Sequence, residues 1–237
     1  MATPVLQLRN VRKYFGSVSA LEDVGLAAYP GEVHAVVGDN GAGKSTMIKI
    51  ITGIHRADEG EVLVEGDAEG NRDIAVVYQD LALVECLDIA HNMALGNLPR
   101  KFGIVLDRRR MEREAAKVLG DLKVRVGNVR TPVGLLSGGQ RQVVAIARAV
   151  RMDRPIMLLD EPTAALGVQE TAHVGDIIEE LRASGKAVLL VSHDLDFVFS
   201  HADRVTVLRL GRTVGTRRIA DVGREEVIGM ITGAIRA

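Results

Sequence analysis

The chain has 237 residues, 47% of them hydrophobic, which is enough to bury one substantial core with a small subdomain attached. Its 30 basic side chains nearly balance its 31 acidic ones, so a large nucleic-acid-binding surface is not implied. The start lacks a secretory signal pattern, the apolar runs are too short to span a bilayer, and the single Cys86 excludes an intrachain disulfide and fits a reducing cytosol.

In chain order, four apolar segments rich in β-branched residues predict buried strands: residues 33–37, 74–78, 156–159 and 187–191. Helical patterns lie between them, at residues 44–52 and at residues 168–184, where Gly185 ends the second helix. Strands that alternate with helices indicate an α/β fold with a largely parallel sheet.

Other segments predict additions to this core. Residues 5–11, 25–29 and 61–65 indicate a smaller antiparallel sheet. Between residues 81 and 152 no strong strand pattern occurs, whereas helical patterns cover 107–122 and 140–150, so we expect a helical subdomain inserted into the core. Near the C-terminus, the chain predicts strands over 204–218 with a turn at Gly211, and then a helix over 224–231.

A glycine-rich loop follows the strand that ends at Val37. Its residues fit the spacing G-x-x-x-x-G-K-[ST] of a phosphate-binding loop: Gly38, Asp39, Asn40, Gly41, Ala42, Gly43, Lys44, Ser45 and Thr46. The glycines let backbone N–H groups approach phosphate oxygens, and the next helix directs the positive end of its dipole at the same anion. We expect Lys44 to reach the β- and γ-phosphates of ATP and the Ser45 hydroxyl to coordinate Mg²⁺.

Two carboxylates, Asp160 and Glu161, follow the strand over 156–159. Taken alone, two acids after an apolar strand are more often a solvated turn. In a parallel α/β sheet, however, the carboxyl ends of the strands converge on the ligand crevice. Beside a phosphate loop we therefore expect Asp160 to hold Mg²⁺ and Glu161 to act as general base on the attacking water.

A pentapeptide ahead of the helix over 140–150 narrows the interpretation to one family. The run Leu136, Ser137, Gly138, Gly139, Gln140 resembles the signature of ATP-binding cassette proteins, and the resemblance covers nearly the whole chain, with every motif in the family's order. Physically, Ser137 is expected to cap the helix while Gly138 and Gly139 expose N–H groups, which makes a second anion-binding helix start.

The resemblance implies a P-loop NTPase fold and one nucleotide-binding domain over residues 1–237. A RecA-like core with an antiparallel β subdomain is then expected in 1–80 and 153–237, and the helical signature subdomain in 81–152. It also implies that two cassettes face each other, so that Ser137 to Gln140 of one completes the γ-phosphate site of the other.

Three further positions resemble elements of the family. Gln79 is similar to the glutamine that contacts Mg²⁺ and the attacking water, and His193 to the histidine that contacts the γ-phosphate. Phe15 resembles the aromatic residue that stacks on adenine, with Tyr14 as a possible substitute. Without the resemblance, each of these would more often be a structural residue. The remaining histidines lack metal-ligand spacing, so no zinc site is expected.

One position departs from the family pattern, because Gly167 stands where most cassettes carry an aspartate that helps to link the two sites. The run Thr163-Ala164-Ala165-Leu166 resembles the branch that serves bacterial monosaccharide importers. That resemblance implies an ATPase peripheral to the cytoplasmic face of the inner membrane, which works with integral-membrane permease subunits and indirectly with a substrate-binding protein. A single set of motifs implies a homodimer or a separate second cassette, and no nucleic acid is expected.

Two alternatives belong to other classes. A soluble cassette ATPase that acts on ribosomes or DNA usually carries a second cassette with a charged linker, or a long coiled coil between the phosphate loop and the signature, and these are absent from this sequence. A lipid or drug exporter usually fuses membrane helices to the cassette, although an exporter made from two genes stays open.

Overall fold

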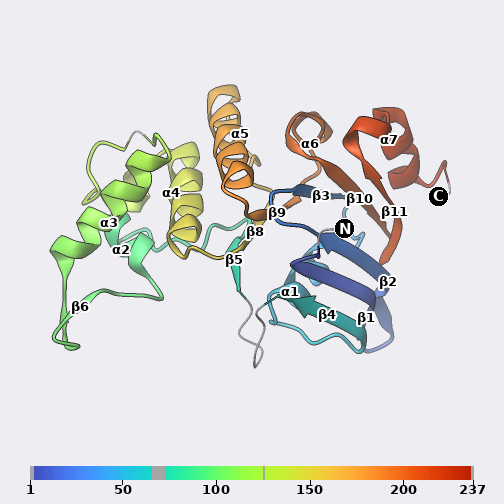
Figure 1. The fold of residues 1–237 in the computed structure, drawn as a ribbon, viewed down its shortest axis with the longest axis horizontal. Coiled ribbons are helices and arrows are strands. Elements are labelled where there is room, and N and C mark those ends of the chain that lie inside the picture. The colour runs from blue at the N-terminus through green and yellow to red at the C-terminus, as the bar shows by residue number, and fades with distance from the viewer. Residues whose placement is uncertain (1–2, 66–72, 125, 236–237) are drawn as a thin grey trace. The chain divides into compact units, whose positions relative to one another are not determined.

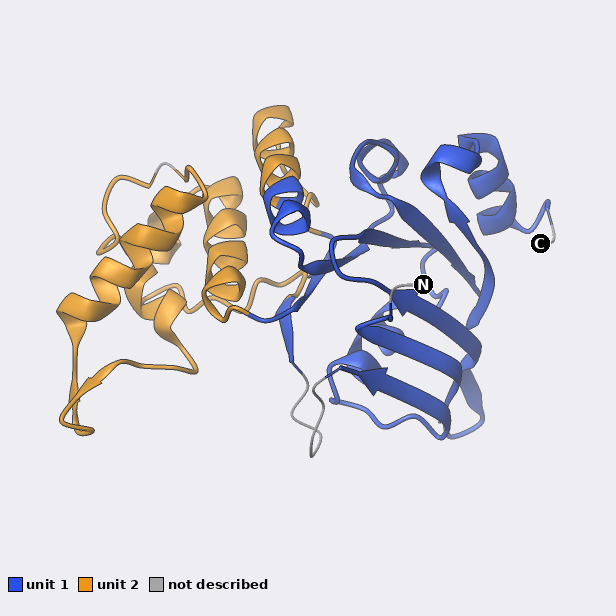
Figure 2. Ribbon diagram, viewed as in Figure 1, with its two compact units in different colours: residues 1–76, 154–161, 178–237 blue, residues 77–153, 162–177 orange. Residues whose placement is uncertain are grey.

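The computed structural model describes residues 3–65, 73–124 and 126–235. Figure 1 shows its helices and strands, and Figure 2 shows the two compact units into which the chain divides. Unit 1 comprises residues 1–76, 154–161 and 178–237, and unit 2 comprises residues 77–153 and 162–177. Within the described residues, no helix is both long and apolar enough to cross a bilayer.

A nine-stranded sheet forms the framework of unit 1, in the order β4-β1-β2-β11-β10-β3-β9-β8-β5. Its strands are β1 Leu6–Phe15, β2 Val18–Ala28, β3 Val33–Val37, β4 Glu59–Val64, β5 Ile74–Val77, β8 Ile156–Asp160, β9 Ala187–Val191, β10 Arg204–Arg209 and β11 Arg212–Arg218. Strands β10, β3, β9 and β8 pair in parallel, which confirms the parallel core expected from the sequence.

The sequence suggested a separate antiparallel sheet, but the antiparallel strands β4, β1 and β2 do not form one. They continue the large sheet, because β2 meets β11 in parallel at Asp23 and Arg212. Strands β1 and β2 are also longer than expected and meet at a tight turn in which Gly16 has a φ of 60°. In the second half of β1 only Val11 is buried, so this half lacks the apolar alternation that marks a strand in a sequence.

Helices of unit 1 are α1 Lys44–Ile51, α6 Leu195–His201 and α7 Arg224–Thr232, with a 3₁₀ turn η2 Ile219–Asp221, while α5 Val168–Ala183 begins in unit 2 and ends in unit 1. Every residue of β3 and of β9 is buried, and β8 is buried up to Asp160. Strands buried on both faces are continuous apolar runs, which explains why the sequence located them to within a residue.

A chain of hydrogen bonds between polar groups runs across the sheet from β2 to β11. The Nδ1–H of His34 in β3 donates to the Ala27 carbonyl at 3.0 Å, so its Nε2 accepts from the Thr206 hydroxyl at 2.7 Å. That hydroxyl in turn lies 2.7 Å from the hydroxyl of Thr216. Burial lowers the pKa of His34 to about 4, and the ring is therefore neutral at neutral pH.

Unit 2 is mainly helical, with α2 Ile89–Ala94, α3 Arg108–Asp121, α4 Gly138–Arg151 and a 3₁₀ turn η1 Val133–Leu135. Helices α2, α3 and α4 pack on one another around buried methionine, leucine and valine side chains. Asn92 is fully buried, and its side chain bonds both backbone groups of Val84 and the carbonyls of Leu87 and Asp88, so it holds the loop that precedes α2. The helical patterns predicted at residues 107–122 and 140–150 correspond to α3 and α4.

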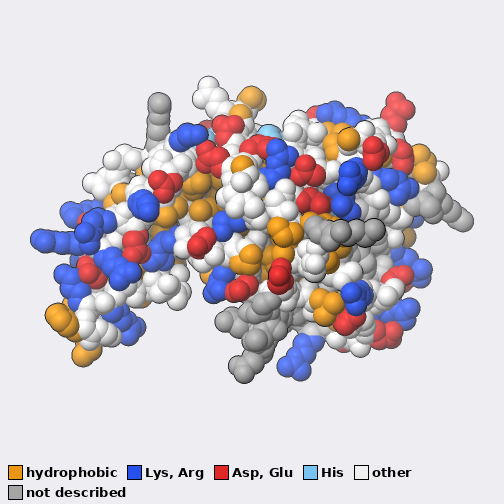
Figure 3. Space-filling model, in the orientation of Figure 1, with side chains coloured by type: hydrophobic (Ala, Val, Ile, Leu, Met, Phe, Trp, Pro, Cys, Tyr) orange, Lys and Arg blue, Asp and Glu red, His pale blue; other side chains and the backbone are white. Residues whose placement is uncertain are grey.

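A hairpin in unit 2 was not expected from the sequence. Strands β6 Arg100–Lys101 and β7 Val105–Leu106 are two residues long, which is too short to produce an alternating pattern. Exposed hydrophobic side chains lie at its end, and Figure 3 shows them as an orange group beside blue basic side chains.

Candidate functional site

The loop between β3 and α1 is built around glycines that tolerate no side chain. A Cβ added to Gly38 would lie 2.2 Å from the backbone oxygen of Leu208, and Gly41 and Gly43 have φ angles of 81° and 105°. The loop is tied down by two backbone bonds, one from Ala42 N–H to the Asp39 carbonyl and one from Gly211 N–H to the Ala42 carbonyl, both at 3.0 Å. The glycine pattern of the sequence is therefore a steric requirement of the fold.

Helix α1 starts without a side-chain cap. Its N-cap is Gly43 in the left-handed conformation, which has no side chain to cap the first turn. The Lys44 ammonium donates to the carbonyls of Gly38 at 2.6 Å and Asp39 at 3.1 Å, which places the cation over the loop. Uncapped N–H groups, the helix dipole and a lysine together favour a bound anion. Asp39, Asn40 and Ser45 are exposed, and Thr46 is half-buried.

Beyond the end of β8, the structure brings two predicted catalytic residues together. The Nδ1 of His193 lies 2.7 Å from Oε2 of Glu161, and the backbone N–H of His193 points to the same oxygen at 3.4 Å. Glu161 has a φ of 50°, which is strained for a residue with a side chain, and its N–H donates to the Val191 carbonyl at 2.8 Å. The carboxylate is mostly buried, at 12% exposure, whereas the imidazole is 71% exposed.

The three predicted Mg²⁺ ligands all offer oxygen donors. Asp160, half-buried at the end of β8, and the exposed hydroxyl of Ser45 belong to unit 1, and the exposed amide of Gln79 follows β5 in unit 2. Carboxylate, hydroxyl and amide oxygens are hard donors, which Mg²⁺ prefers. The donor chemistry of these three predicted ligands therefore fits this ion.

Phe15 ends β1 with a ring that is 45% exposed. The His55 ring packs edge-on against it, with 5.3 Å between ring centroids, and the Lys13 ammonium lies 5.5 Å from its centroid. Tyr14 is also partly exposed, and its backbone N–H donates to Asp58 at 2.7 Å. An exposed aromatic face with a supporting ring suits base stacking, so Phe15 stays the predicted adenine contact.

The signature segment in unit 2 forms a closed helix cap. The Ser137 hydroxyl accepts from the Gln140 N–H at 3.2 Å, and the Gln140 side chain accepts from the Ser137 N–H at 3.1 Å, which is a capping box. The sequence predicted this cap at Ser137. Gly138 is exposed and a Cβ there would meet no atom within 4 Å, whereas a Cβ at Gly139 would lie 2.4 Å from Cγ of Glu170.

Glu170 was missed by the sequence analysis, although it contacts two of the glycines discussed there. Besides Gly139, it meets Gly167, where an added Cβ would lie 2.7 Å from its Oε2. The aspartate expected by the family pattern at 167 would collide with this carboxylate. The available signal was the spacing, since a glutamate three residues after a helix start is common in helix caps.

Gln79 lines a pocket of unit 2, of about 280 Å³. The segment 164–166 and the signature residues Gly138 and Arg141 line the same pocket, and Ala165 has a φ of 61°. Unit 2 therefore gathers Gln79, the segment after Glu161 and the signature in one place.

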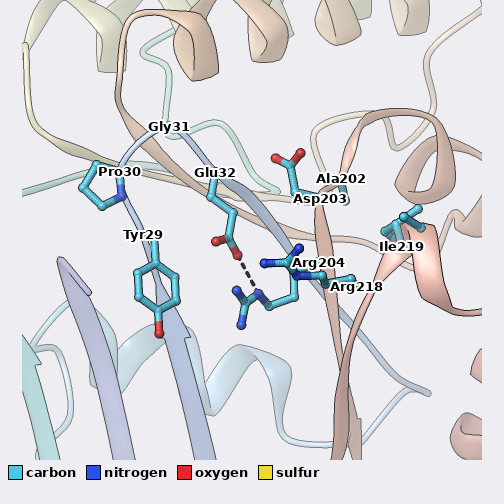
Figure 4. Close-up of a pocket in the computed structure, with 10 residues that line it drawn as sticks. Tyr29, Pro30, Gly31, Glu32, Ala202, Asp203, Arg204, Arg218 and Ile219 are labelled. Atoms are coloured by element: carbon cyan, nitrogen blue, oxygen red, sulfur yellow. Dashed lines mark ion pairs between the residues drawn. The ribbon is translucent and has the colours of Figure 1, made fainter. Parts of the chain in front are cut away.

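A groove in unit 1, of about 920 Å³, lies at the opposite ends of the strands (Figure 4). The Glu32 carboxylate pairs there with Arg204 at 2.9 Å, and the Arg204 guanidinium packs on the Tyr29 ring. Burial raises the pKa of Glu32 despite this partner. Because the groove is at the amino ends of β3 and β10, it is separate from the phosphate loop, which follows the carboxyl end of β3.

Comparison with known proteins agrees with this geometry. A model of the ABC transporter family matches residues 21–164. The fructose import ATP-binding protein FrcA of Rhizobium meliloti is 42% identical over 246 residues, which cover 98% of this chain and 95% of that protein. The ribose import ATP-binding protein RbsA 1 of Rubrobacter xylanophilus is 43% identical over 97% of this chain, but this chain spans only about half of its length, 47%.

Solved structures agree as well. A nucleotide-free ATP-binding cassette from an ABC transporter superposes with a TM-score of 0.81 at 28% identity, over 97% of this chain and 96% of that one. The dimeric post-hydrolysis state of the cassette MJ0796 bound to ADP and Pi superposes with a TM-score of 0.78 at 28% identity, over 90% and 98% of the two chains.

Proposed function

The chain belongs to the ABC transporter family, and from this premise we propose that it is the ATP-binding and ATP-hydrolysing subunit of a monosaccharide importer. The uncapped start of α1, with its glycine loop and Lys44, supports the nucleotide part of the proposal. Two relatives are named as fructose and ribose import ATP-binding proteins, and these names support the sugar part of the proposal.

In this proposal the phosphates of ATP lie on the loop over 38–46. Loop N–H groups bind phosphate oxygens, and the Lys44 ammonium moves from the loop carbonyls to the β- and γ-phosphates. Ser45, Asp160 and Gln79 would hold Mg²⁺, which supplies positive charge against the charge that develops on the phosphates. The Phe15 ring stacks on the base.

Hydrolysis needs a base that is aligned before water attacks. His193 donates to Oε2 of Glu161 and so fixes the carboxylate, which leaves Oε1 to accept the proton of the attacking water. The strained φ of Glu161 and its bond to Val191 hold the backbone of the same residue. The exposed side of the imidazole stays available to the γ-phosphate.

The signature half of the site comes from a second cassette. The N–H groups of Gly138 and Gly139 at the start of α4 would face the γ-phosphate bound on the partner copy, and dimer closure would drive a membrane permease from the cytoplasmic face of the inner membrane. The dimeric state of the cassette MJ0796 supports this arrangement.

The contact between Glu161 and His193 is the observation that carries the proposed reaction, and the substitution Glu161→Gln tests it. The amide keeps the shape and cannot take a proton, so we expect ATP hydrolysis to fall by about 10²–10⁴-fold while ATP still binds. Gel filtration with MgATP should then show an accumulated dimer.

Glu32→Gln is the matched control, because this carboxylate lies at the opposite ends of the strands, and its hydrolysis rate should stay normal. Normal turnover by the Glu161→Gln variant would disprove the assignment of the base. The sugar part is tested separately, by uptake of labelled fructose and ribose into vesicles that contain the membrane protein which co-purifies with the chain.

A further inference from the structure

The end of the β6–β7 hairpin has a backbone that does not suit its side chains. The Ile104 N–H donates to the Lys101 carbonyl at 3.2 Å, and the two residues between them, Phe102 and Gly103, have φ angles of 50° and 75°. Positive φ at both central positions is the requirement of a type I′ turn, for which asparagine followed by glycine is the preferred sequence. Phenylalanine at the first position therefore costs the turn stability.

Nothing in the described part of the fold compensates for that cost. Phe102 is 98% exposed, Ile104 85% and Val105 61%, so these side chains bury almost no apolar surface within the described residues. Single exposed hydrophobic residues are common, but three together at the end of a protruding turn form an apolar patch of the kind that marks an interaction site. We refer to residues 102–105 as the hairpin tip.

Exposed basic residues lie on both sides of the hairpin tip in the chain. Arg100 and Lys101 precede it, and Arg108 and Arg109 follow it in the first turn of α3, all of them exposed. In the described part of the chain, Arg100, Arg108 and Arg109 form no ion pair, while Lys101 approaches Asp107 only at 3.9 Å. We refer to these four residues as the basic flank, which stands out in a chain whose net charge is −1.

An apolar tip flanked by cations is complementary to an anionic membrane surface. Aromatic and branched side chains partition into the boundary between headgroups and acyl chains, and nearby arginines bind lipid phosphates. Figure 3 shows the two kinds of side chain next to each other at the hairpin. A purely protein-binding patch does not need this excess of positive charge.

We propose that the hairpin tip inserts into the headgroup region of an anionic lipid bilayer and that the basic flank binds the lipid phosphates. This contact goes beyond the proposed function, because it needs neither nucleotide nor permease. It would give a cassette without membrane helices in its described residues a direct contact with the membrane surface.

The absence of tryptophan from the chain makes the contact directly measurable. Phe102→Trp places a single fluorophore at the tip, and Val168→Trp, at a residue that is 89% exposed at the start of α5, is the matched control. On protein-free vesicles of phosphatidylglycerol and phosphatidylcholine, we expect a blue shift and quenching by brominated lipids for the first reporter only. Vesicles of phosphatidylcholine alone, or salt at about 0.5 M, should weaken the effect because screening removes the electrostatic part.

Two sets of variants separate the tip from the flank in vesicle co-sedimentation. Phe102→Asn together with Ile104→Ser should reduce the binding constant by about tenfold or more, because two large apolar side chains no longer partition. Arg108→Gln with Arg109→Gln should reduce it by about fivefold for each charge. Phe102→Asn alone should unfold at the same or a higher temperature than the wild type, since asparagine suits the turn. Loss of vesicle binding together with unchanged stability cannot come from misfolding.

Three results would overturn the proposal. If the emission of the Phe102→Trp variant does not change on protein-free anionic vesicles, the tip does not insert into the bilayer. A blue shift that appears without vesicles as the protein concentration rises would assign the tip to a second copy. Binding that persists in the Phe102→Asn, Ile104→Ser variant would place the membrane contact elsewhere. None of these results bears on ATP hydrolysis, because the hairpin contains no residue of the proposed nucleotide site.

Discussion

Both helix α1 in unit 1 and helix α4 in unit 2 have glycine at their start, as the N-cap Gly43 of α1 and as the first residue Gly138 of α4. The first N–H groups of the two helices are nevertheless satisfied in different ways. At α1 the cap residue is Gly43, which has no side chain to accept a bond, and the lysine that follows turns back onto loop carbonyls. At α4 the reciprocal bonds between Ser137 and Gln140 satisfy two N–H groups within the helix itself.

The difference shows which start depends on a ligand. The loop before α1 leaves donors for a bound anion, so phosphate would complete its hydrogen bonding. At the start of α4 the capping box already satisfies the N–H groups of Ser137 and Gln140, and it does not use those of Gly138 and Gly139, next to the exposed edge at Gly138. In the proposed function, unit 1 would therefore provide the binding site, and unit 2 would provide a capped helix start for the site of the partner copy.

The largest difference between the two units is expected when alanine replaces Gly38 of the phosphate loop or Gly138 of the signature. Gly38→Ala would drive a methyl group into the backbone oxygen of Leu208, and we expect the free energy of unfolding to fall by about 3 kcal/mol or more. Gly138→Ala meets open space in a helix, and its stability should stay within about 0.5 kcal/mol of the wild type. Urea denaturation measures both.

The second variant should still fail in function. A methyl group at the exposed Gly138 would stand between α4 and the nucleotide of the partner cassette, so ATP hydrolysis should drop although folding is intact. If instead Gly138→Ala hydrolyses ATP normally, the start of α4 is not part of the site.

Mild acidification should act more on unit 1 than on unit 2, because Glu112 and Glu114 of unit 2 have pKa values that arginine partners lower, so their contribution is lost only at lower pH. The pKa of His34 is about 4 in the folded protein, below its ordinary 6.5, so the unfolded chain binds a proton between these values that the folded chain does not. Stability from this residue is complete above pH 6.5 and is lost as the pH falls toward 4, by at most about 3 kcal/mol. Glu32, whose pKa is raised, offsets part of this loss because its folded form holds a proton more tightly.

Hydrogen exchange at pH values of about 4.5 and about 7, on either side of the ordinary histidine pKa, checks this prediction. Protection factors, which correct each amide for the intrinsic slowing of exchange in acid, should fall at the lower pH in β3 and β10 and change far less in α4. His34→Gln should remove most of the difference between the two pH values. An equal fall of the protection factors in both units would show that His34 is not responsible.

The smallest predicted effect concerns the cap of α4. Ser137→Ala removes the acceptor for the Gln140 N–H, which should cost about 1 kcal/mol and increase exchange in the first turn of the helix. Ser137→Asp keeps an acceptor and should preserve most of the stability. Were alanine to cost nothing, the capping box would not stabilise the start of α4.

Features that depend on contiguous residues could be predicted from the sequence. The phosphate loop follows a buried strand and precedes a helix within one short segment, so its residue order alone indicated the geometry of residues 38–46. The helix cap at Ser137 is likewise local, since its partner Gln140 lies three positions away. The continuous apolar runs of β3 and β9 predicted their burial, because only strands covered on both faces have that composition.

What only the tertiary structure decided depends on segments that are distant in the chain. Glu161 and His193 meet because β8 and β9 pair in parallel and end at the same edge, and the register of that pairing is not written in either segment. The contacts of Glu170 with Gly139 and Gly167 require the folded path of unit 2. The exposed position of Phe102 depends on the positive φ angles of Phe102 and Gly103, in a loop between strands too short to have a pattern. Local spacing thus determined what each motif can bind, and long-range packing decided which side chains act together.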